Sequence, residues 1–585
     1  MLRQLLRNEL KPLCALMCLA VGLGACSSPT RRTQEQRVAS VVVSRSTVTP
    51  PATIVTSVPG TSSLSSSSSV PISPPVSPTS TAATTSTSPP DTGQHAIQTV
   101  VYDAGMQQLP DATADTRRWW GVVSAPSDGP GPFPVAVVLH GAHSFCSGAS
   151  GTRAWPCPDG TEIPNHEGLA YLTDALARRG FVAIAPGLNA EYALDRDGRA
   201  PGTITAAIVE RDLRALQTGQ PAFGINPSIV DTSRLVLVGH SRGGSIAAVL
   251  ARPDSVLSAS YPTRGVVLLA PSPDTVGPDR LADVAAVVVV GTCDGDTGVT
   301  SARFATDALM ANRRTPVGLV LMDGATHNAI NDRLAPEDLL SGRPGCGDGD
   351  RLTPSAQREL LAASVPELAR RVLGAPAAGI GATIFEPMRA EDTGSPRMSV
   401  VHIDPSSARM SLLPDLTLPG AGDRLSTGFA TTWCPAGNYS SYSRPGTERC
   451  HRVELDDLVG TPAALAMTWE QPGASLTAPV GVDAPGAVLV VRAFTDPIDE
   501  RMGPGPVMLQ LSGRRPDASI WTAQITVPVA ALGVPFPPFG ARRGAVLWTE
   551  QRLPLDTPLT AVTLTVMSPA QGSIQLVSLE TVRLP

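Results

Sequence analysis

A serine stands at the centre of the motif Gly-His-Ser-Arg-Gly, which spans residues 239–243. Four apolar residues precede the motif, and an Ala-containing stretch of helical pattern follows it. A G-x-S-x-G motif between a strand and a helix is typical of a sharp turn that lifts the serine hydroxyl above a sheet. The flanking glycines permit that turn, where an ordinary side chain would obstruct it. The sequence therefore predicts that Ser241 is a nucleophile.

A hydroxyl is a weak nucleophile at its free pKa, so it needs an adjacent base that is itself oriented by an acid. After a serine in this setting, the acid and then the histidine are expected, each beyond a later strand. His327 follows the apolar run 319–322 and is the predicted base. The run 287–290 is followed by Gly-Thr-Cys-Asp-Gly-Asp, in which Asp294 is the preferred acid and Asp296 the alternative. Either carboxylate would orient the imidazole and stabilise its charged form.

Acyl transfer also requires hydrogen-bond donors for the oxyanion of its tetrahedral intermediate. The apolar run 133–139 leads into a His-Gly-Ala segment, so the backbone N–H groups of Ala142 and Arg242 are the expected donors. His140 and His143 are also candidate zinc ligands, but no third ligand at a metal-site spacing accompanies them. We therefore assign both histidines to this loop and predict no metal site and no cofactor.

The elements that must position these residues lie between residues 97 and 373, where short apolar runs alternate with helical patterns. Runs rich in Val and Leu on both faces predict a mostly parallel sheet covered by helices on both sides. Two leading segments, 97–102 and 120–124, are expected to add antiparallel edge strands. We predict an α/β domain of the α/β-hydrolase type over residues 96–376.

The pattern changes after about residue 384, where short apolar segments are separated by Gly, Pro and Asp turns. Regular short strands with turn signals predict a β-sandwich-like domain over residues 382–585, beginning with a strand at 399–403. Its aromatic residues are candidates for a sugar-binding platform on envelope polysaccharide, with sandwich core as the alternative; they are Trp433, Tyr439, Tyr442, Trp469, Trp521 and Trp548.

The first residues predict export. A positive start and a short apolar run, too short to span a bilayer, precede the segment Leu-Gly-Ala-Cys that ends at Cys26. This arrangement resembles a bacterial lipoprotein signal peptide over residues 1–26, with Cys26 as the lipidated residue and the membrane as the partner of that lipid. Residues 27–95 are rich in Ser, Thr and Pro, so we expect a disordered stalk. The protein would then lie at the outer face of the cell membrane.

Six cysteines remain after the predicted signal peptide, and an even number in an exported chain indicates disulfides. Connectivity does not follow from sequence alone. Pairing along the chain keeps each bridge within one predicted domain, and the resulting pairs are Cys146 with Cys157, Cys293 with Cys346, and Cys434 with Cys450. The second pair would hold the acid loop and the segment after His327 together.

Several short motifs occur along the chain in an order that resembles that of known hydrolases. They are His-Gly at 140–141, Cys146, Trp-Pro-Cys-Pro-Asp-Gly at 155–160, Gly-His-Ser-Arg-Gly-Gly at 239–244, Cys-Asp-Gly-Asp at 293–296 and His-Asn at 327–328. Together they resemble the exported α/β-hydrolases of high-GC actinobacteria, and the serine motif is similar to that of chlorophyllases. The layout resembles dienelactone-hydrolase-like esterases. The resemblance covers about residues 130–375 and implies an esterase with Ser241, Asp294 and His327 as its triad. Thr297 departs from the pattern, since such chains usually carry Val after Cys-Asp-Gly-Asp.

The net charge of −6 and the lack of a basic stripe argue against a nucleic-acid partner. The favoured function is an extracytoplasmic serine hydrolase of carboxylic esters whose natural substrate the sequence does not identify. A serine peptidase and a catalytically inactive envelope-binding protein are the alternatives. The peptidase would use the same triad, and the binding protein is disfavoured because every catalytic part is present.

Overall fold

The computed structural model describes residues between 94 and 583. Outside the description lie residues 1–93, 109–115, 148–155, 158–161, 195–201, 273–280, 336–337, 339–348, 387–394, 396, 414–420, 435–436, 440–456, 462, 481–487, 496–505, 528–542, 545–547 and 584–585. The predicted signal peptide, Cys26, almost all of the stalk, Cys346 and Cys450 therefore fall outside it. Among the described residues, no helix is both long and apolar enough to cross a membrane.

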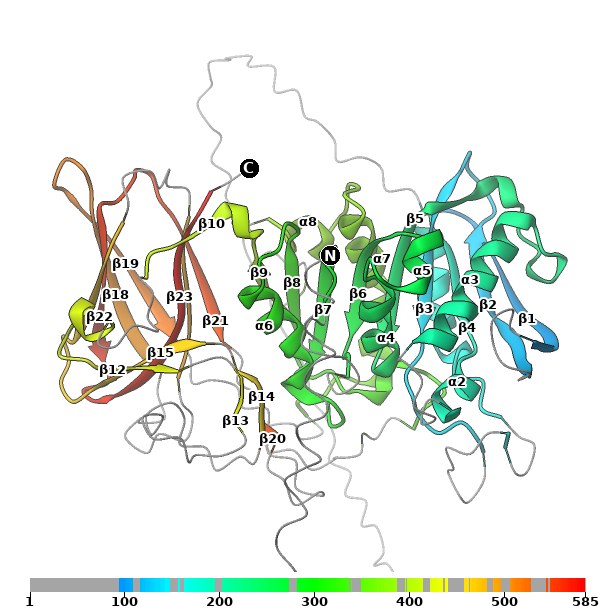
Figure 1. Cartoon of the computed structure of the whole chain (residues 1–585), viewed down its shortest axis with the longest axis horizontal. Coiled ribbons are helices and arrows are strands. Elements are labelled where there is room, and N and C mark those ends of the chain that lie inside the picture. The colour runs from blue at the N-terminus through cyan, green and yellow to red at the C-terminus, as the bar shows by residue number, and fades with distance from the viewer. Residues whose placement is uncertain are drawn as a thin grey trace, which may run out of the picture. The chain divides into compact units, whose positions relative to one another are not determined.

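A nine-stranded sheet forms the first part of the fold, in the order β1-β2-β4-β3-β5-β6-β7-β8-β9 (Figure 1). The six strands from β4 to β8 in that order are mutually parallel, and β1, β2 and β9 add antiparallel pairs at the edges. The strand bounds are β1 Ile97–Gln108, β2 Thr116–Pro126, β3 Phe133–Leu139, β4 Val182–Pro186, β5 Val230–His240, β6 Thr263–Leu269, β7 Ala285–Gly291, β8 Val317–Met322 and β9 Met398–Ile403.

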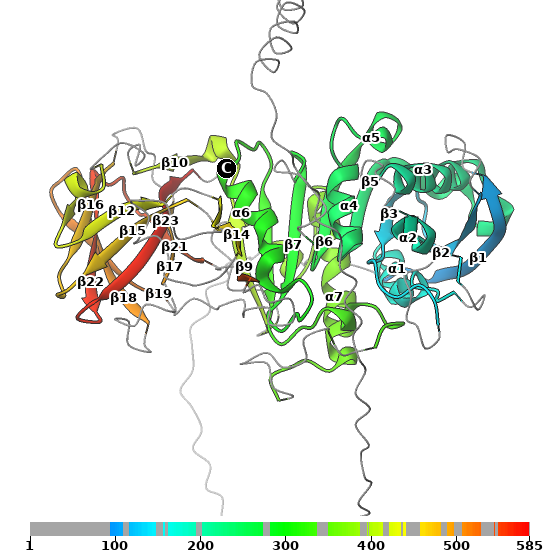
Figure 2. The same ribbon diagram turned by 60° about the horizontal axis from the view of Figure 1, so that its bottom comes forward.

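Helices cover both faces of this sheet (Figure 2). Alternate residues of β3 face opposite sides, as the period of a strand requires. Val135 and Val137 pack in a core with α3, α4 and α6, whereas Ala136 and Val138 pack in a second core with α1 and α7. The helix bounds are α1 Ala170–Arg178, α2 Asn189–Leu194, α3 Thr203–Thr218, α4 Arg242–Leu250, α5 Val256–Ser260, α6 Arg303–Met310, α7 Pro354–Val372 and α8 Ile380–Thr383. The predicted α/β class and the two antiparallel edge strands are confirmed.

Antiparallel sheets make up the C-terminal part. One has the order β12-β15-β23-β17-β21, with β10 paired to β23, and another has the order β11-β16-β22-β18-β19. Side chains of both, such as Leu489 and Leu509, share one hydrophobic core, so the two sheets pack face to face. A small third sheet joins β13, β14 and β20. The bounds are β10 Arg409–Ser411, β11 Ser426–Thr427, β12 Ala430–Cys434, β13 Gly437–Tyr439, β14 Asp457–Thr461, β15 Ala464–Trp469, β16 Ser475–Pro479, β17 Val488–Phe494, β18 Val507–Arg514, β19 Ile520–Val527, β20 Arg543–Gly544, β21 Thr549–Pro554, β22 Ala561–Ser568 and β23 Gly572–Val582.

The strand expected at 399–403 differs from its prediction. We expected it to begin the C-terminal domain, but as β9 it pairs antiparallel with β8 and ends the first sheet. A short strand carries the alternation of a half-buried surface whichever sheet it joins, so its pattern does not identify its partner.

Two of the aromatic residues considered for a sugar platform lie in the core. Trp469 and Trp548 are each only 2% exposed, and Trp469 donates from Nε1 to the carbonyl oxygen of Pro569 at 3.0 Å. Trp433 and Trp521 are partly buried against the sandwich core. The side chains of Tyr439 and Tyr442 lie outside the described residues.

Candidate active site

Ser241 occupies the turn between β5 and α4, with φ 55° and ψ −124°. A non-glycine residue at positive φ costs of order 1–3 kcal/mol and is retained where the surrounding structure holds it, often at a functional site. The amide of Ser241 is held by a hydrogen bond to the carbonyl oxygen of Leu269 on β6, at 2.9 Å. The turn therefore fixes the serine backbone in the strained conformation that its motif predicts.

Close backbone packing explains the glycines around the serine. A Cβ on Gly239 would collide with the backbone of Gly243, and one on Gly243 would collide with the carbonyl oxygen of Leu139 at the end of β3. A Cβ on Gly141 would lie 2.8 Å from the Cβ of Ser241. The loop after β3 therefore approaches the serine as closely as glycine allows, and Ala142 follows directly in that loop, with Arg242 as the first residue of α4.

The histidine and the preferred acid form a fully buried pair. His327 Nδ1 lies 2.8 Å from Asp294 Oδ2, and neither side chain is exposed to solvent. Because an ionised carboxylate only accepts hydrogen bonds, Nδ1 carries a proton, and when the ring is neutral Nε2 presents its lone pair. Nε2 is buried and has no hydrogen-bond partner among the described residues, so it is not bonded to Ser241 in this conformation. Such bonds are often long or absent before substrate binds.

Asp294 is held by the backbone of its own loop. Its Oδ1 accepts from the N–H groups of Asp296 and Thr297 at 2.8 Å and of Gly298 at 3.0 Å. Burial alone would raise the pKa of Asp294, but these donors and His327 keep the pKa below its usual value. Thr297, the residue that stands where the resembled chains usually carry Val, donates a hydroxyl bond to Oδ2 at 2.9 Å and so adds to the hydrogen bonds that hold Asp294.

The alternative acid lies on the other side of the imidazole. Asp296 Oδ2 is 3.5 Å from His327 Nε2, and its side chain is 34% exposed. Asp294 is bonded to Nδ1, so Asp296 lies beside the opposite ring nitrogen and does not share the position of Asp294. The structure brings Asp294 to the Nδ1 side of the imidazole and Asp296 to its Nε2 side.

Asp338 is a site residue that the sequence analysis missed. Its carboxylate accepts from the backbone N–H groups of Gly295 at 2.7 Å and of His327 and Asn328 at 2.8 Å. It therefore ties the acid loop to the histidine loop. No pattern in the sequence distinguishes Asp338 from the other acidic residues of its segment.

Three carboxylates consequently surround one imidazole. Burial would lower the pKa of His327, but Asp294, Asp296 and Asp338 together raise it to about 9. The charged imidazole is thus strongly favoured in this environment, and the neutral form, which alone can accept a proton, becomes the major form only as pH rises toward 9.

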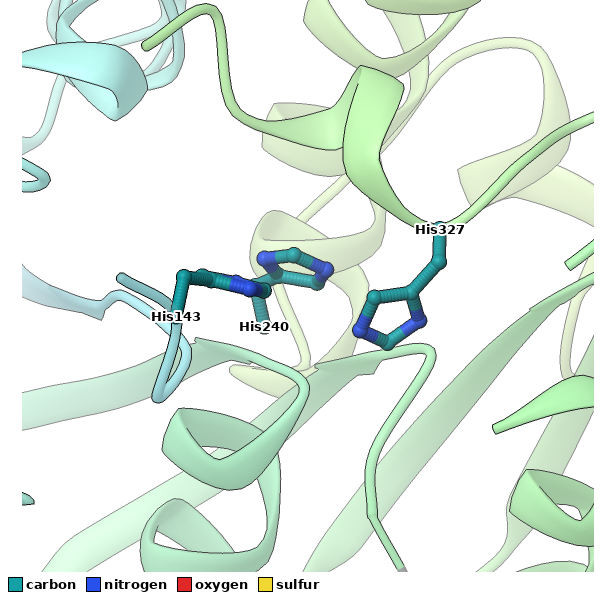
Figure 3. Close-up of side chains that lie close together, drawn as sticks. All are labelled: His143, His240 and His327. Atoms are coloured by element: carbon teal, nitrogen blue, oxygen red, sulfur yellow. The ribbon is translucent and has the colours of Figure 1, made fainter. Parts of the chain in front are cut away.

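The two histidines considered as zinc ligands have different surroundings. His140 accepts from the amide of Leu188 at Nε2 and hydrogen-bonds the carbonyl oxygen of Gly141 at Nδ1, at 2.9 and 2.8 Å. Both of its nitrogens are used, and burial lowers its pKa to about 4, so it is a structural residue of the loop. His143 instead lies beside His240 and His327 (Figure 3), which the sequence analysis did not group with it.

One of the three expected disulfides is present in full. Cys146 and Cys157 are bonded, with their Cα atoms 5.4 Å apart, and so close the loop beyond Ala142. Cys293 and Cys434 are also disulfide-bonded. Their expected partners, Cys346 and Cys450, lie outside the described residues, so those two pairings stay predictions.

Comparisons with known proteins add little. No family model matches the chain, and no curated protein matches it. Among solved structures, the chain is similar to a protein from Klebsiella pneumoniae subsp. pneumoniae MGH 78578 that was assigned as a dienelactone hydrolase. The two share 16% sequence identity with a TM-score of 0.29, over 46% of this chain and 98% of that chain.

Proposed function

We propose that this chain is a serine hydrolase that cleaves carboxylic esters through Ser241, His327 and Asp294. One observation carries the proposal. A serine in a strained strand-to-helix turn and a buried His–Asp pair follow parallel strands of one sheet, at the edge where such sheets place their active sites.

The proposed reaction uses each group in turn. Ser241 Oγ attacks the ester carbonyl while His327 Nε2 accepts its proton, and the oxyanion is stabilised by the N–H groups of Ala142 and Arg242. The protonated His327 then gives its proton to the leaving alcohol, and water releases the acyl group by the reverse sequence. Asp294 holds the ring with Nδ1–H toward itself and stabilises the positive charge.

The loop contacts support this assignment of roles. The approach of Gly141 to Ser241 places the loop after β3 beside the nucleophile, where an oxyanion donor must lie. The rings of His240 and His327 are 4.7 Å apart between centroids, so the base lies next to the residue that precedes the serine. We further propose that the enzyme is exported and anchored through Cys26.

Labelling with a fluorophosphonate probe tests the proposal. The wild-type protein should be labelled, and Ser241→Ala should lose both the label and ester hydrolysis, with kcat falling by about 10⁶-fold. Ser260→Ala, an exposed serine at the end of α5, is the matched control and should label normally.

A panel of p-nitrophenyl esters and peptide substrates then identifies the substrate class. Hydrolysis of esters supports the proposal. A folded wild-type protein that neither labels nor cleaves esters would refute it, and cleavage of peptides alone would replace the esterase with a peptidase.

A further inference from the structure

Three histidines converge at the ends of three strands. His143 follows β3, His240 ends β5 and His327 follows β8. One ring nitrogen of each lies within 4.8 Å of the others, and all three are buried. Figure 3 shows the rings turned toward one another from separate segments. Ring centroids are 5.2 Å apart for His143 and His240, and 5.9 Å apart for His143 and His327.

The nitrogens in this cluster have the character of metal ligands. Both ring nitrogens of His240 are buried and lack a hydrogen bond of normal geometry among the described residues, although the ring interacts with the backbone of His327. Buried polar atoms are normally hydrogen-bonded, so such an exception calls for an explanation. A neutral imidazole nitrogen with its lone pair directed at other imidazoles is the usual ligand of zinc.

His327 has the second interaction that metal-binding histidines commonly make. It donates Nδ1–H to Asp294 at 2.8 Å, which leaves Nε2 as the ligand atom. A histidine that binds metal through one nitrogen usually donates the other to a carboxylate, because this fixes the tautomer and the ring orientation.

The cluster needs only a small contraction to fit a zinc ion. Zn–N bonds of about 2.0–2.1 Å in tetrahedral geometry separate ligand nitrogens by about 3.3 Å. The present limit of 4.8 Å therefore has to shrink by about 1.5 Å at most. His143 lies in a loop without helix or strand, so its side chain can supply most of that movement.

We propose that His143, His240 and His327 bind one Zn²⁺ ion, and that the bound ion blocks catalysis reversibly. Zinc would occupy His327 Nε2, the atom that has to accept the proton of Ser241. Magnesium and calcium prefer oxygen ligands and should not bind there. The blocking role rests on the proposed function, whereas the metal site itself does not.

Equilibrium binding tests the site without reference to activity. Full-length protein without a histidine tag is titrated with ZnCl₂ against a chromophoric chelator, and with Co²⁺ to detect the visible absorption of tetrahedral coordination. We expect one equivalent of tightly bound metal. His143→Gln and His240→Asn should each weaken binding by about 100-fold or more, since even outer-shell changes at zinc sites cost 10–100-fold. His95→Gln, a histidine paired with Asp128 away from the cluster, is the matched control and should bind like the wild type.

Each result has a definite meaning. Absence of saturable binding, or equal binding by the wild type and His143→Gln, would overturn the metal site. If His240→Asn does not fold, His143→Gln decides alone, because His143 belongs to a loop.

Inhibition is measured separately, with each variant compared to its own metal-free rate. Zinc should inhibit the wild type and protect Ser241 from fluorophosphonate, and His143→Gln should resist both effects. A protein that binds one zinc through the cluster but shows no hydrolysis would retain the metal site and refute the proposed function. An active protein whose tightly bound zinc leaves the rate unchanged would overturn the blocking role.

Discussion

Replacement of Asp294 by Asn separates the two candidate acids with the smallest change in shape. The amide oxygen of Asn can keep the three backbone hydrogen bonds now made to Oδ1. The amide nitrogen then stands in the place of Oδ2, which now accepts from His327 Nδ1 at 2.8 Å. An amide nitrogen donates and does not accept, so His327 must carry its proton on Nε2. In that tautomer the ring has no lone pair for the serine proton.

The expected loss follows from this change of tautomer. An Asp→Asn replacement behind a catalytic histidine lowers kcat by about 10⁴-fold, equivalent to about 5.5 kcal/mol in the barrier. Asp296→Asn, the matched control, should change kcat by less than about tenfold, because a partly exposed charge on the reacting side is screened by water. It should also move the acidic limb of the pH profile to lower pH, because the Asp296 charge helps to raise the pKa of His327.

The assay is steady-state hydrolysis of a p-nitrophenyl ester over a range of pH, with circular dichroism to establish that each variant is folded. Burst kinetics separate acylation from deacylation. A folded Asp294→Asn enzyme that keeps its rate, or an Asp296→Asn enzyme that loses about 10³-fold or more, would refute the assignment and identify Asp296 as the acid.

Three further predictions concern pH and stability. The carboxylates around His327 raise its pKa to about 9. The proposed base acts when neutral, so kcat/KM should increase with pH up to about 9. A pH profile of kcat/KM with its midpoint near 6.5, the value of a free imidazole, would contradict this prediction. Burial raises the pKa of Glu191 to about 7 from 4.5, so its contribution to stability is present below pH 4.5 and is lost as pH rises through 7. Urea unfolding should show that the free energy of unfolding of the wild type falls by on the order of 3 kcal/mol between pH 5 and pH 8, and that Glu191→Gln lacks this fall. An equal fall in both proteins would contradict the prediction. Arg492→Met removes the partner that two buried carboxylates share, since Glu550 then keeps only Arg552 and Glu580 keeps only Arg409. It should cost about 3–5 kcal/mol, well above the effect of Arg515→Met at a partly exposed ion pair.

The sequence predicted the parts of the fold that local patterns determine. The Val-rich run 287–290 is apolar on both faces, and it became the central strand β7 of a covered parallel sheet. The serine turn was predicted because its glycines and flanking elements form one contiguous signature, and Ser241 has the strained backbone expected there.

Features that depend on distant pairing were missed. Asp338 acts through backbone N–H groups of two other segments, and no spacing in the chain shows which carboxylate will reach them. His240 was treated only as a variable position of the serine motif, although its ring meets two histidines from other loops. Such contacts arise where strands that are separated in sequence end side by side in the sheet.

The outer edge of β9 shows why the C-terminal sheets belong to the same folded body as the proposed catalytic residues. An unpaired strand edge presents backbone groups that must be covered or paired. The carbonyl oxygen of His402 in β9 accepts from Arg492 at 3.2 Å, and its N–H donates to Glu550 at 3.2 Å, both from the C-terminal sheets. Arg492 is fully buried and is neutralised by Glu550 and Glu580, each at 2.6 Å. Such a network is stabilising only when every member is present, because a buried charge without its partner is costly. The C-terminal sheets therefore complete the edge of the sheet that carries Ser241, and any additional binding role must lie on residues outside this buried network.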